Sequence, residues 1–352
     1  MRYLIVQDWA NTHGNHAGMV HMCKLLVKHY PNDYKMIVKD CPPERKKRSN
    51  PVIRRIMAKF DEKQYRKSFV NDYMSICQEM FSELKRGDKV FLLEYNWPST
   101  SQYELACYIK STFYGVEIFA LSHLTPTYFK RDKNVVARIL EWDKPIDKHL
   151  TLGSSLSNYF QSIGIPSNKI STGFHYVDSD YYKSKNLVVL DKITVITMGF
   201  LQRDYNMLAD IVKGTSNVEW IICRGKKNDV DQYFPQTPNV QLKGYMQEDE
   251  LREMMDRADV SLNVMEDTVG SNVITTSMAM GLVLVVSDVG SIRDYCDETN
   301  TVFCHNTAQS FIDAINSLTQ KTRAEITEMG TNSVKKANSF SIEKVHSWLS
   351  AL

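Results

Sequence analysis

The stretch Gly270–Gly290, which reads GSNVITTSMAMGLVLVVSDVG, is the most specific part of this sequence. Its first half predicts a helix that begins at about Ser271 or Asn272, directly after a glycine. Its second half contains the unbroken apolar run Leu282–Val286, which predicts a buried strand. The start of such a helix presents unpaired backbone N–H groups, so it stabilises an anion such as a diphosphate.

Small residues recur at the end of this predicted helix. Ser277, Ala279 and Gly281 would let the helix approach the sheet closely. Tight helix–sheet contacts also occur in β-α-β units that bind no ligand, so this stretch alone leaves both interpretations open. The order of the surrounding motifs favours the ligand-binding one.

Short apolar runs alternate with amphipathic stretches along nearly the whole chain, which is typical of parallel sheets built from β-α-β units. They form two consecutive series that join near Ser184–Asp191, and 352 residues suit two domains of about 150 residues. Ligands of such folds bind beyond the carboxyl ends of the strands. The strands predicted for the first series are Tyr3–Val6, Tyr34–Val38, Lys89–Leu93, Glu117–Ala120 and His149–Leu152, and its helices are Met19–His29, Phe69–Lys85, Ser101–Thr112 and Ser155–Ile163. The strands predicted for the second series are Ile193–Met198, Glu219–Cys223, Val240–Leu242, Val260–Asn263, Val283–Ser287 and Thr301–Cys304, and a separate amphipathic helix, Ser339–Leu352, ends the chain.

The composition argues against several other classes of protein. Lys and Arg number 43 against 41 Asp and Glu, so net charge indicates no nucleic-acid partner. The seven cysteines are scattered without a Cys-x-x-Cys pair, which favours reduced thiols over disulfides or a zinc site. The first residues enter a predicted strand without a signal-peptide segment, and no run approaches 18 apolar residues. We therefore expect a cytoplasmic protein.

The stretch Gly270–Gly290 resembles the donor-binding signature of the retaining glycosyltransferases of family 4, also called glycosyl transferases group 1. In that family a glycine-containing loop opens a helix ending in Ala-Met-Ala-x-Gly, and a buried strand and Ser/Thr-Asp-x-Gly follow. The resemblance implies the GT-B fold, in which two Rossmann-like doubly wound domains face a cleft.

Other motifs follow in the order that this resemblance predicts. Ile163–Ile170 and Val177–Tyr182 resemble the end of a first domain, and Ile196–Tyr205 resembles the loop that opens the second. The motifs around Asn239–Met246 and Ala258–Leu262 continue the series. The resemblance covers roughly residues 150–350 well and 1–150 loosely. It implies an acceptor-binding domain over 1–184, a nucleotide-sugar-binding domain over 185–338, and a helix over 339–352 that returns to the first domain.

One departure from the family pattern concerns two glutamates. The family carries Glu-x7-Glu, whose second member binds the ribose of the nucleotide, and these positions fall here on Thr268 and Thr276. A threonine hydroxyl still forms hydrogen bonds with a ribose hydroxyl but carries no charge. Glu266 lies two residues before the first position and can partly substitute. The departure leaves retention of stereochemistry open.

Basic residues follow two strands of the second series. Arg203 lies in the loop after Ile193–Met198, which also contains Gly199, and could grip a donor diphosphate through charge-assisted hydrogen bonds. The alternative interpretation is that Arg203 is an exposed loop residue and that the aspartate after it caps a helix. Arg224 and Lys226 follow the next strand and compete for the same role.

The resemblance assigns the remaining donor contacts to three loops. Tyr245 and Met246 lie where the family holds the nucleotide base. The helix start, Gly270, Ser271, Asn272 and Val273, would bind the diphosphate, and the N-terminal loop with Gly14 and Gly18 would lie near the sugar and phosphate.

Histidines in the first half are candidates for other chemistry. His123 ends an apolar run, where the family often has a histidine close to the transferred sugar, and its imidazole could take part in proton transfer. The alternative is a loop histidine held by the backbone. His13, His16 and His21 lack the spacing and the carboxylate of a known zinc motif, and Asp178-Ser-Asp180 is interpreted as linker. We expect no metal.

The segment Glu44–Lys67 carries ten Lys or Arg against three acidic residues, with apolar residues at helical spacing. A basic amphipathic helix can lie on an anionic membrane surface or pack its apolar side on the domain, and both interpretations stay open. The overall prediction is a transferase that moves a sugar from a nucleoside diphosphate sugar, UDP-sugar favoured, to a glycan or lipid-linked glycan in polysaccharide biosynthesis. It would need no metal and would reside in the cytoplasm or on the inner face of the membrane. The alternatives are a degenerate glycosyltransferase-like binding or scaffold protein and a sugar-nucleotide epimerase or phosphorylase of the same fold.

Overall fold

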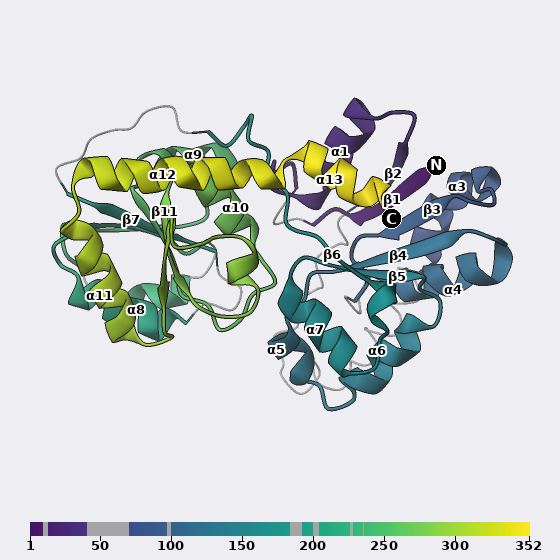
Figure 1. Cartoon of the computed structure of the whole chain (residues 1–352), viewed down its shortest axis with the longest axis horizontal. Coiled ribbons are helices and arrows are strands. Elements are labelled where there is room, and N and C mark those ends of the chain that lie inside the picture. The colour runs from purple at the N-terminus through teal and green to yellow at the C-terminus, as the bar shows by residue number, and fades with distance from the viewer. Residues whose placement is uncertain are drawn as a thin grey trace, which may run out of the picture. The chain divides into compact units, whose positions relative to one another are not determined.

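The computed structural model describes residues 1–9, 13–40, 70–96, 100–183, 192–199, 204–225, 228–234 and 236–352. These residues separate into two compact units (Figure 1). Unit 1 comprises Met1–Leu152 and Leu156–Gly173, and unit 2 comprises Gly153–Ser155 and Phe174–Leu352. Each unit is built around a parallel sheet of its own.

The described part of unit 1 contains a six-stranded sheet in the order β2-β1-β3-β4-β5-β6. All neighbouring strands are parallel, and β1 pairs with both β2 and β3. The order therefore reverses at β1, which is where doubly wound sheets bind their ligands. The strands are β1 (Arg2–Gln7), β2 (Tyr34–Lys39), β3 (Lys89–Leu92), β4 (Glu117–Ser122), β5 (Lys148–Thr151) and β6 (Ile170–Thr172).

Helices connect these strands and bury their apolar sides against the sheet. The core contains the buried residues Ile5, Leu92 and Ile118 from the strands and Leu105 and Ile109 from α4. The helices of this part are α1 (Met19–His29), α3 (Gln78–Glu83), α4 (Gln102–Thr112), α5 (Pro126–Lys130), α6 (Val135–Asp143) and α7 (Ser154–Ser162).

The described part of unit 2 contains a second six-stranded parallel sheet in the order β12-β11-β10-β7-β8-β9. This is the strand order of dinucleotide-binding domains, with the reversal between β7 and β10. Helices α8 and α11 cover one face of the sheet, and α10 and α12 the other (Figure 1). The strands are β7 (Thr194–Met198), β8 (Glu219–Cys223), β9 (Val240–Lys243), β10 (Val260–Asn263), β11 (Val283–Ser287) and β12 (Thr301–Cys304). The helices are α8 (Tyr205–Gly214), α9 (Glu248–Asp256), α10 (Asn272–Ala279), α11 (Ala308–Thr319), α12 (Arg323–Ala337) and α13 (Ile342–Ser350).

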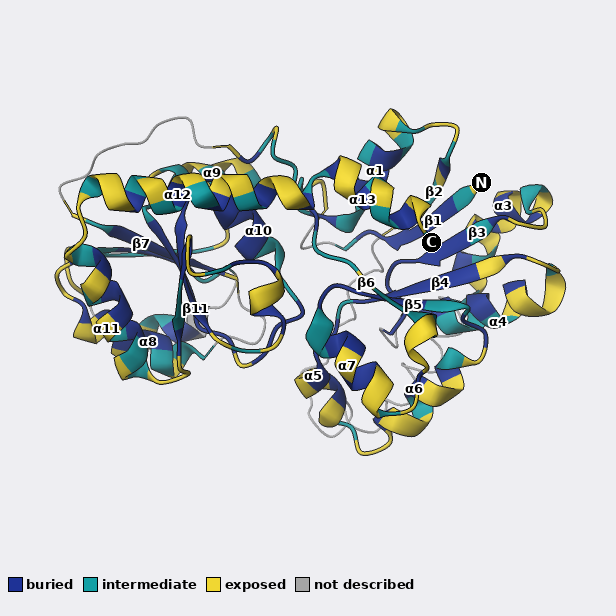
Figure 2. Cartoon of the chain, in the orientation of Figure 1, coloured by how far each residue is buried: buried dark blue, intermediate teal, exposed yellow. Residues whose placement is uncertain are grey.

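Most predicted elements are confirmed, because continuous apolar runs become the buried strands of both sheets (Figure 2). One correction concerns the predicted helix Phe69–Lys85, which is interrupted by a turn at Cys77 between helical residues 70–76 and α3. The sequence analysis missed three short elements, α5, α6 and β6. The return of the final helix to the first domain stays a prediction. Within the described ranges, no helix is long and apolar enough to cross a membrane.

Candidate functional site

The loop between β10 and α10 in unit 2 is held by a chain of hydrogen bonds. Thr268 N–H donates to the Asp267 carboxylate at 2.8 Å, and the Thr268 hydroxyl accepts from Gly270 N–H at 3.0 Å. Ser291 N–H donates to the Thr268 carbonyl at 2.8 Å, which ties the loop to the segment after β11. Asp267 and Thr268 are buried, so contacts within unit 2 hold the backbone of this loop.

Two glycines make this geometry possible. Gly270 has a φ of +95°, and a Cβ atom there would overlap the ring of Tyr295. Gly290 has a φ of +56°, and a Cβ atom there would overlap the Thr268 carbonyl. Since positive φ values are readily adopted only by glycine, both positions require it. The motif that begins and ends with these glycines therefore forms one packed unit.

Helix α10 begins where the sequence predicted. Ser271 is its N-cap, and the Ser271 hydroxyl accepts a hydrogen bond from Val273 N–H at 3.1 Å. The first turn contains no acidic residue, so no carboxylate of that turn offsets the partial positive charge at this helix terminus. The Thr276 hydroxyl donates to the Asn272 carbonyl at 2.7 Å, and the Thr276 side chain is therefore directed along its own helix.

The predicted close approach of α10 to the sheet is also present. The Ser277 hydroxyl donates to the Ser261 hydroxyl of β10 at 2.8 Å, and both residues are fully buried. On the outer side, Gly330 of α12 lies so close to the Gly281 carbonyl that a Cβ atom would overlap it. Small residues thus let α10 pack between the sheet and α12.

A small hollow lies at the carboxyl ends of β7 and β8. It is lined by Thr197, Gly199, Asp204, Tyr205, Leu208, Ile222, Cys223 and Val264. The Asp204 carboxylate caps α8 by accepting from Met207 N–H at 3.0 Å, and Gly199 has a φ of +82°. The hollow adjoins the reversal of strand order between β7 and β10, the position expected for a ligand. The predicted diphosphate contacts Arg203 and Lys226 lie outside the described residues.

Arg224, which follows β8, is paired within its own unit. Its guanidinium donates to the Asp231 carboxylate at 2.9 Å and to the Gly225 carbonyl at 3.2 Å. An anion at this position would share Arg224 with Asp231. After β9, Tyr245 is half exposed, at 50%, and Met246 is half-buried, so both loop residues are accessible to a ligand. Glu266 is exposed beside the buried Asp267.

Unit 1 presents acids and imidazoles at the corresponding edge of its sheet. His123 directly follows β4, and its Nε2 donates to the Leu93 carbonyl at 2.7 Å. Its Nε2 also lies 3.9 Å from the Glu94 carboxylate, which is buried after β3. Burial raises the pKa of the Glu94 carboxyl, while His123 and a hydrogen bond from Trp9 oppose that rise. Because Nε2 carries the proton, the Nδ1 atom of a neutral His123 can only accept a hydrogen bond.

A second acid–imidazole pair follows β1. The Nδ1 atom of His13 lies 2.5 Å from the Asp8 carboxylate, and Asp8 is 8% exposed. Gly14 follows with a φ of +76° and open space around its Cα, and Gly18 is the N-cap of α1.

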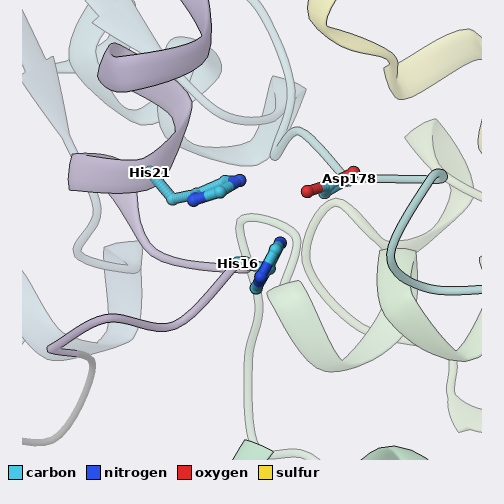
Figure 3. Close-up of side chains that lie close together, drawn as sticks. All are labelled: His16, His21 and Asp178. Carbon is cyan, nitrogen blue, oxygen red and sulfur yellow. The ribbon is translucent and has the colours of Figure 1, made fainter. Parts of the chain in front are cut away.

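The other two histidines of the N-terminal segment lie side by side. Figure 3 shows the rings of His16 and His21, whose centroids are 4.2 Å apart at an interplanar angle of 41°. Asp178, the third side chain drawn there, belongs to unit 2.

The sequence analysis missed Asp8, Glu94 and the pairing of His13. Glu94 directly follows an apolar run, and Asp8 follows one with a single polar residue between, as His123 does. That signal could have found them, because the carboxyl ends of parallel strands meet at one edge of a sheet. The partner of each imidazole required the folded chain.

These features define a protein with two doubly wound Rossmann-like units, the second of which carries a loop fixed by hydrogen bonds at its reversal point. Residues 198–321, from the end of β7 past the end of α11, match the protein family described as Glycosyl transferases group 1. The predicted resemblance to this family is confirmed for that domain.

Solved structures confirm the GT-B fold for the whole chain. The chain is similar to Anabaena Alr3699/HepE in complex with UDP-glucose, with a TM-score of 0.68 and 12% identity, covering 99% of this chain and 100% of that one. It is similar to sucrose-phosphate synthase from Thermosynechococcus elongatus, with a TM-score of 0.73 and 10% identity over 98% and 96% of the two chains. It is also similar to the lipopolysaccharide outer core galactosyltransferase WaaB, with a TM-score of 0.67 and 12% identity over 100% and 99%. No curated protein matches the chain by sequence.

Proposed function

We propose that this protein transfers a sugar from a nucleoside diphosphate sugar, with UDP-sugar favoured, to a glycan or lipid-linked glycan acceptor. The observation that carries the proposal is the loop from Asp267 to Ser271, which leads into α10 at the strand reversal and lies inside the matched family segment. Such a helix start, with no acid in its first turn, suits the diphosphate of the donor. The UDP-glucose bound by the similar HepE protein supports this choice of donor class.

The donor is proposed to bind unit 2, through residues 185–338, and the acceptor to bind residues 1–184. Gly270, Ser271, Asn272 and Val273 would stabilise the charge that grows on the departing diphosphate, together with Arg203. Arg224, Lys226 and Gly199 would complete the phosphate contacts, and the N-terminal Gly14 and Gly18 would lie near the sugar. Tyr245 and Met246 would hold the base, and Glu266, Thr268 and Thr276 the ribose. We infer a metal-independent, retaining reaction in which these groups neutralise the diphosphate.

A second candidate is a protein that binds the nucleotide without turnover. One observation favours this candidate. Thr268 and Thr276 occupy the positions at which the family carries glutamates, and their hydroxyls form hydrogen bonds inside their own loop and helix. A sugar-nucleotide epimerase of the same fold would contact the donor in a similar way but would need no acceptor.

Two measurements test these proposals. A thermal-shift screen of nucleotide sugars identifies the donor, because a ligand that binds only the folded state raises the melting temperature. Consumption of that donor in a single-turnover experiment then separates a transferase from a binding protein. Repeating the experiment with a chelator tests whether the reaction needs a metal. Binding without any release of nucleoside diphosphate would contradict the enzymatic proposal.

The lipid-linked acceptor and the location on the inner face of the membrane rest on Glu44–Lys67, a segment outside the described residues. Basic side chains near an anionic surface contribute about 1 kcal/mol each. Replacing Arg45, Lys46, Lys47 and Arg48 by serine should release the protein from anionic vesicles, and salt should release the wild type similarly. A wild type that ignores such vesicles at low salt would remove this part of the proposal.

A further inference from the structure

Helix α6 of unit 1 carries two apolar stripes, only one of which is buried (Figure 2). The side chains of Val135, Ile139 and Trp142 are buried, and their spacing places them on one side of the helix. Val136 and Leu140 each follow a buried residue directly, and four positions separate them, so they form a second stripe. Both are 39% exposed. Packing within unit 1 therefore leaves this second stripe partly open to solvent.

Basic side chains lie directly before the same helix. Lys130 ends α5, and Lys133 lies in the turn that leads to α6, three residues before Val136; both lysines are exposed. The acidic residues of α5, α6 and this turn are each paired with another cation. These pairs are Asp132–Arg138, Glu141–Lys144 and Asp143–Lys169. Acids of the same segment therefore do not neutralise Lys130 and Lys133, and this end of the stripe is positively charged.

An anionic lipid surface matches both features. Its headgroups attract basic side chains, and its acyl region takes up apolar ones. A nucleic acid would be attracted by the lysines, but it binds side chains by charge and by stacking on aromatic rings, which Val136 and Leu140 do not offer. A second copy that met the first through the same patch would bring like charges together. The combination of charge and aliphatic exposure therefore favours a membrane over these two partners.

We propose that the surface formed by Lys130, Lys133, Val136 and Leu140 binds an anionic membrane, with the lysines at the headgroups and the aliphatic side chains in the acyl boundary. All four residues belong to unit 1. The proposal deepens the membrane location proposed above, on which it rests, and assigns that role to a second surface outside Glu44–Lys67. Lipid binding requires no sugar transfer, so it is tested without donor or acceptor.

Sedimentation of the full chain with vesicles at low salt measures this contact. The vesicles contain equal parts of phosphatidylglycerol and phosphatidylcholine, and vesicles of phosphatidylcholine alone are the neutral reference. Lys130→Gln combined with Lys133→Gln should weaken binding to the anionic vesicles by about 30-fold, because each basic side chain near such a surface strengthens binding several-fold. Val136→Ser combined with Leu140→Ser should weaken it by roughly 10-fold, because lipid no longer takes up the exposed part of the two side chains.

Unit 2 provides a matched control for these variants. Val334 of α12 is also 39% exposed, and the exposed Lys335 follows it. Val334→Ser combined with Lys335→Gln removes the same two kinds of group from another exposed helix and should leave vesicle binding unchanged. Melting curves show whether each variant is folded.

The outcomes separate this surface from the other proposals. Weaker binding of both unit 1 variants, with the control still bound, would support it. Folded unit 1 variants that bind as the wild type does, while the serine variant of Arg45–Arg48 is released, would overturn this surface and keep the proposed membrane location. If the wild type stays in solution with anionic vesicles at low salt, both membrane proposals fail, and donor consumption by the soluble protein then tests the transferase separately.

Two further results would overturn the proposal in part or in favour of another partner. A loss of binding in the lysine variant alone would mean adsorption by charge and would remove the apolar stripe from the contact. If the Val136 and Leu140 variant binds vesicles as the wild type does but dissociates a dimer in sedimentation velocity, the stripe meets a second copy of the chain instead of lipid.

Discussion

The two units use the same edge of the same kind of sheet, but they furnish it with different chemistry. In unit 2 the loop before α10 is built from glycines, backbone groups, hydroxyls and the buried Asp267 carboxylate, whose polar groups satisfy one another. In unit 1 the strand ends carry the acids Asp8 and Glu94, each beside a histidine. A fixed array of dipoles suits an anion, whereas acid–imidazole pairs suit proton transfer. This difference supports the proposal that unit 2 binds the diphosphate and that unit 1 supplies groups for proton transfer.

The largest effect should come from Gly270, on which the backbone geometry of unit 2 depends. In Gly270→Ala the new Cβ atom meets the buried Tyr295 ring at a φ of +95°. Left-handed strain of about 1–2 kcal/mol and overpacking of about 1–3 kcal/mol should together destabilise unit 2 by roughly 3 kcal/mol. Urea unfolding and UDP affinity measure the result, and both should fall.

Gly87 provides a matched control for that substitution. It has a φ of +90°, but a Cβ atom there would meet nothing within 4 Å. Gly87→Ala should therefore cost only the strain of about 1–2 kcal/mol and leave UDP affinity unchanged. Equal losses of stability in the two variants would mean that Tyr295 moves aside and that the loop is less rigid than its contacts indicate.

Replacing a histidine of unit 1 should instead lower turnover and leave UDP affinity unchanged. His123→Ala should lower turnover by roughly 10²-fold, because an imidazole beside the sugar would be lost, while UDP affinity stays near that of the wild type. Steady-state and single-turnover rates check this. If His123→Ala keeps wild-type turnover, the role of His123 is structural. Its hydrogen bond to the Leu93 carbonyl then holds the loop in place.

Arg203 tests whether side-chain charge adds to the backbone site of unit 2. Its loss should weaken nucleoside diphosphate binding by about 1.5–3 kcal/mol, with turnover falling in parallel. Isothermal titration with UDP measures the change, and Arg257→Ala, an exposed arginine after α9, is the control. An unchanged affinity in Arg203→Ala would leave the helix start and Arg224 as the diphosphate contacts.

The sequence predicted the fold well because strands buried on both faces of a parallel sheet are continuous apolar runs. It missed β6 because Ile170–Thr172 is short and only partly buried. The start of α10 was predictable from Ser271, since a serine cap after a glycine is a local signal. The hydrogen bonds of the Thr268 and Thr276 hydroxyls were not predictable, because they depend on a loop geometry that no pattern of residue types encodes. The pairs of His13 and His123 escaped for the same reason.

The smallest effect concerns the buried polar network of unit 1, which has no role in the proposed site. His149 of β5 is fully buried, and its Nε2 lies 2.9 Å from the Asp143 carboxylate, which also binds Lys169 at 2.6 Å. Burial lowers the pKa of His149 below its usual 6.5, against the opposing effect of Asp143.

This shift fixes the direction of a pH effect on unit 1. Below about pH 6.5 the unfolded chain takes up a proton at this histidine and the folded chain does not, so the unfolded state gains stability as pH falls. Unit 1 should therefore lose up to about 1.4 kcal/mol per pH unit below 6.5, down to the lowered pKa. Calorimetric unfolding at pH 7.0 and 5.5 should show a drop in Tm of a few degrees for unit 1. His149→Gln should abolish that pH slope, whatever its own cost in stability, whereas His29→Gln on the exposed end of α1 should keep it. A slope that survives in His149→Gln would place the acid sensitivity at other titrating groups.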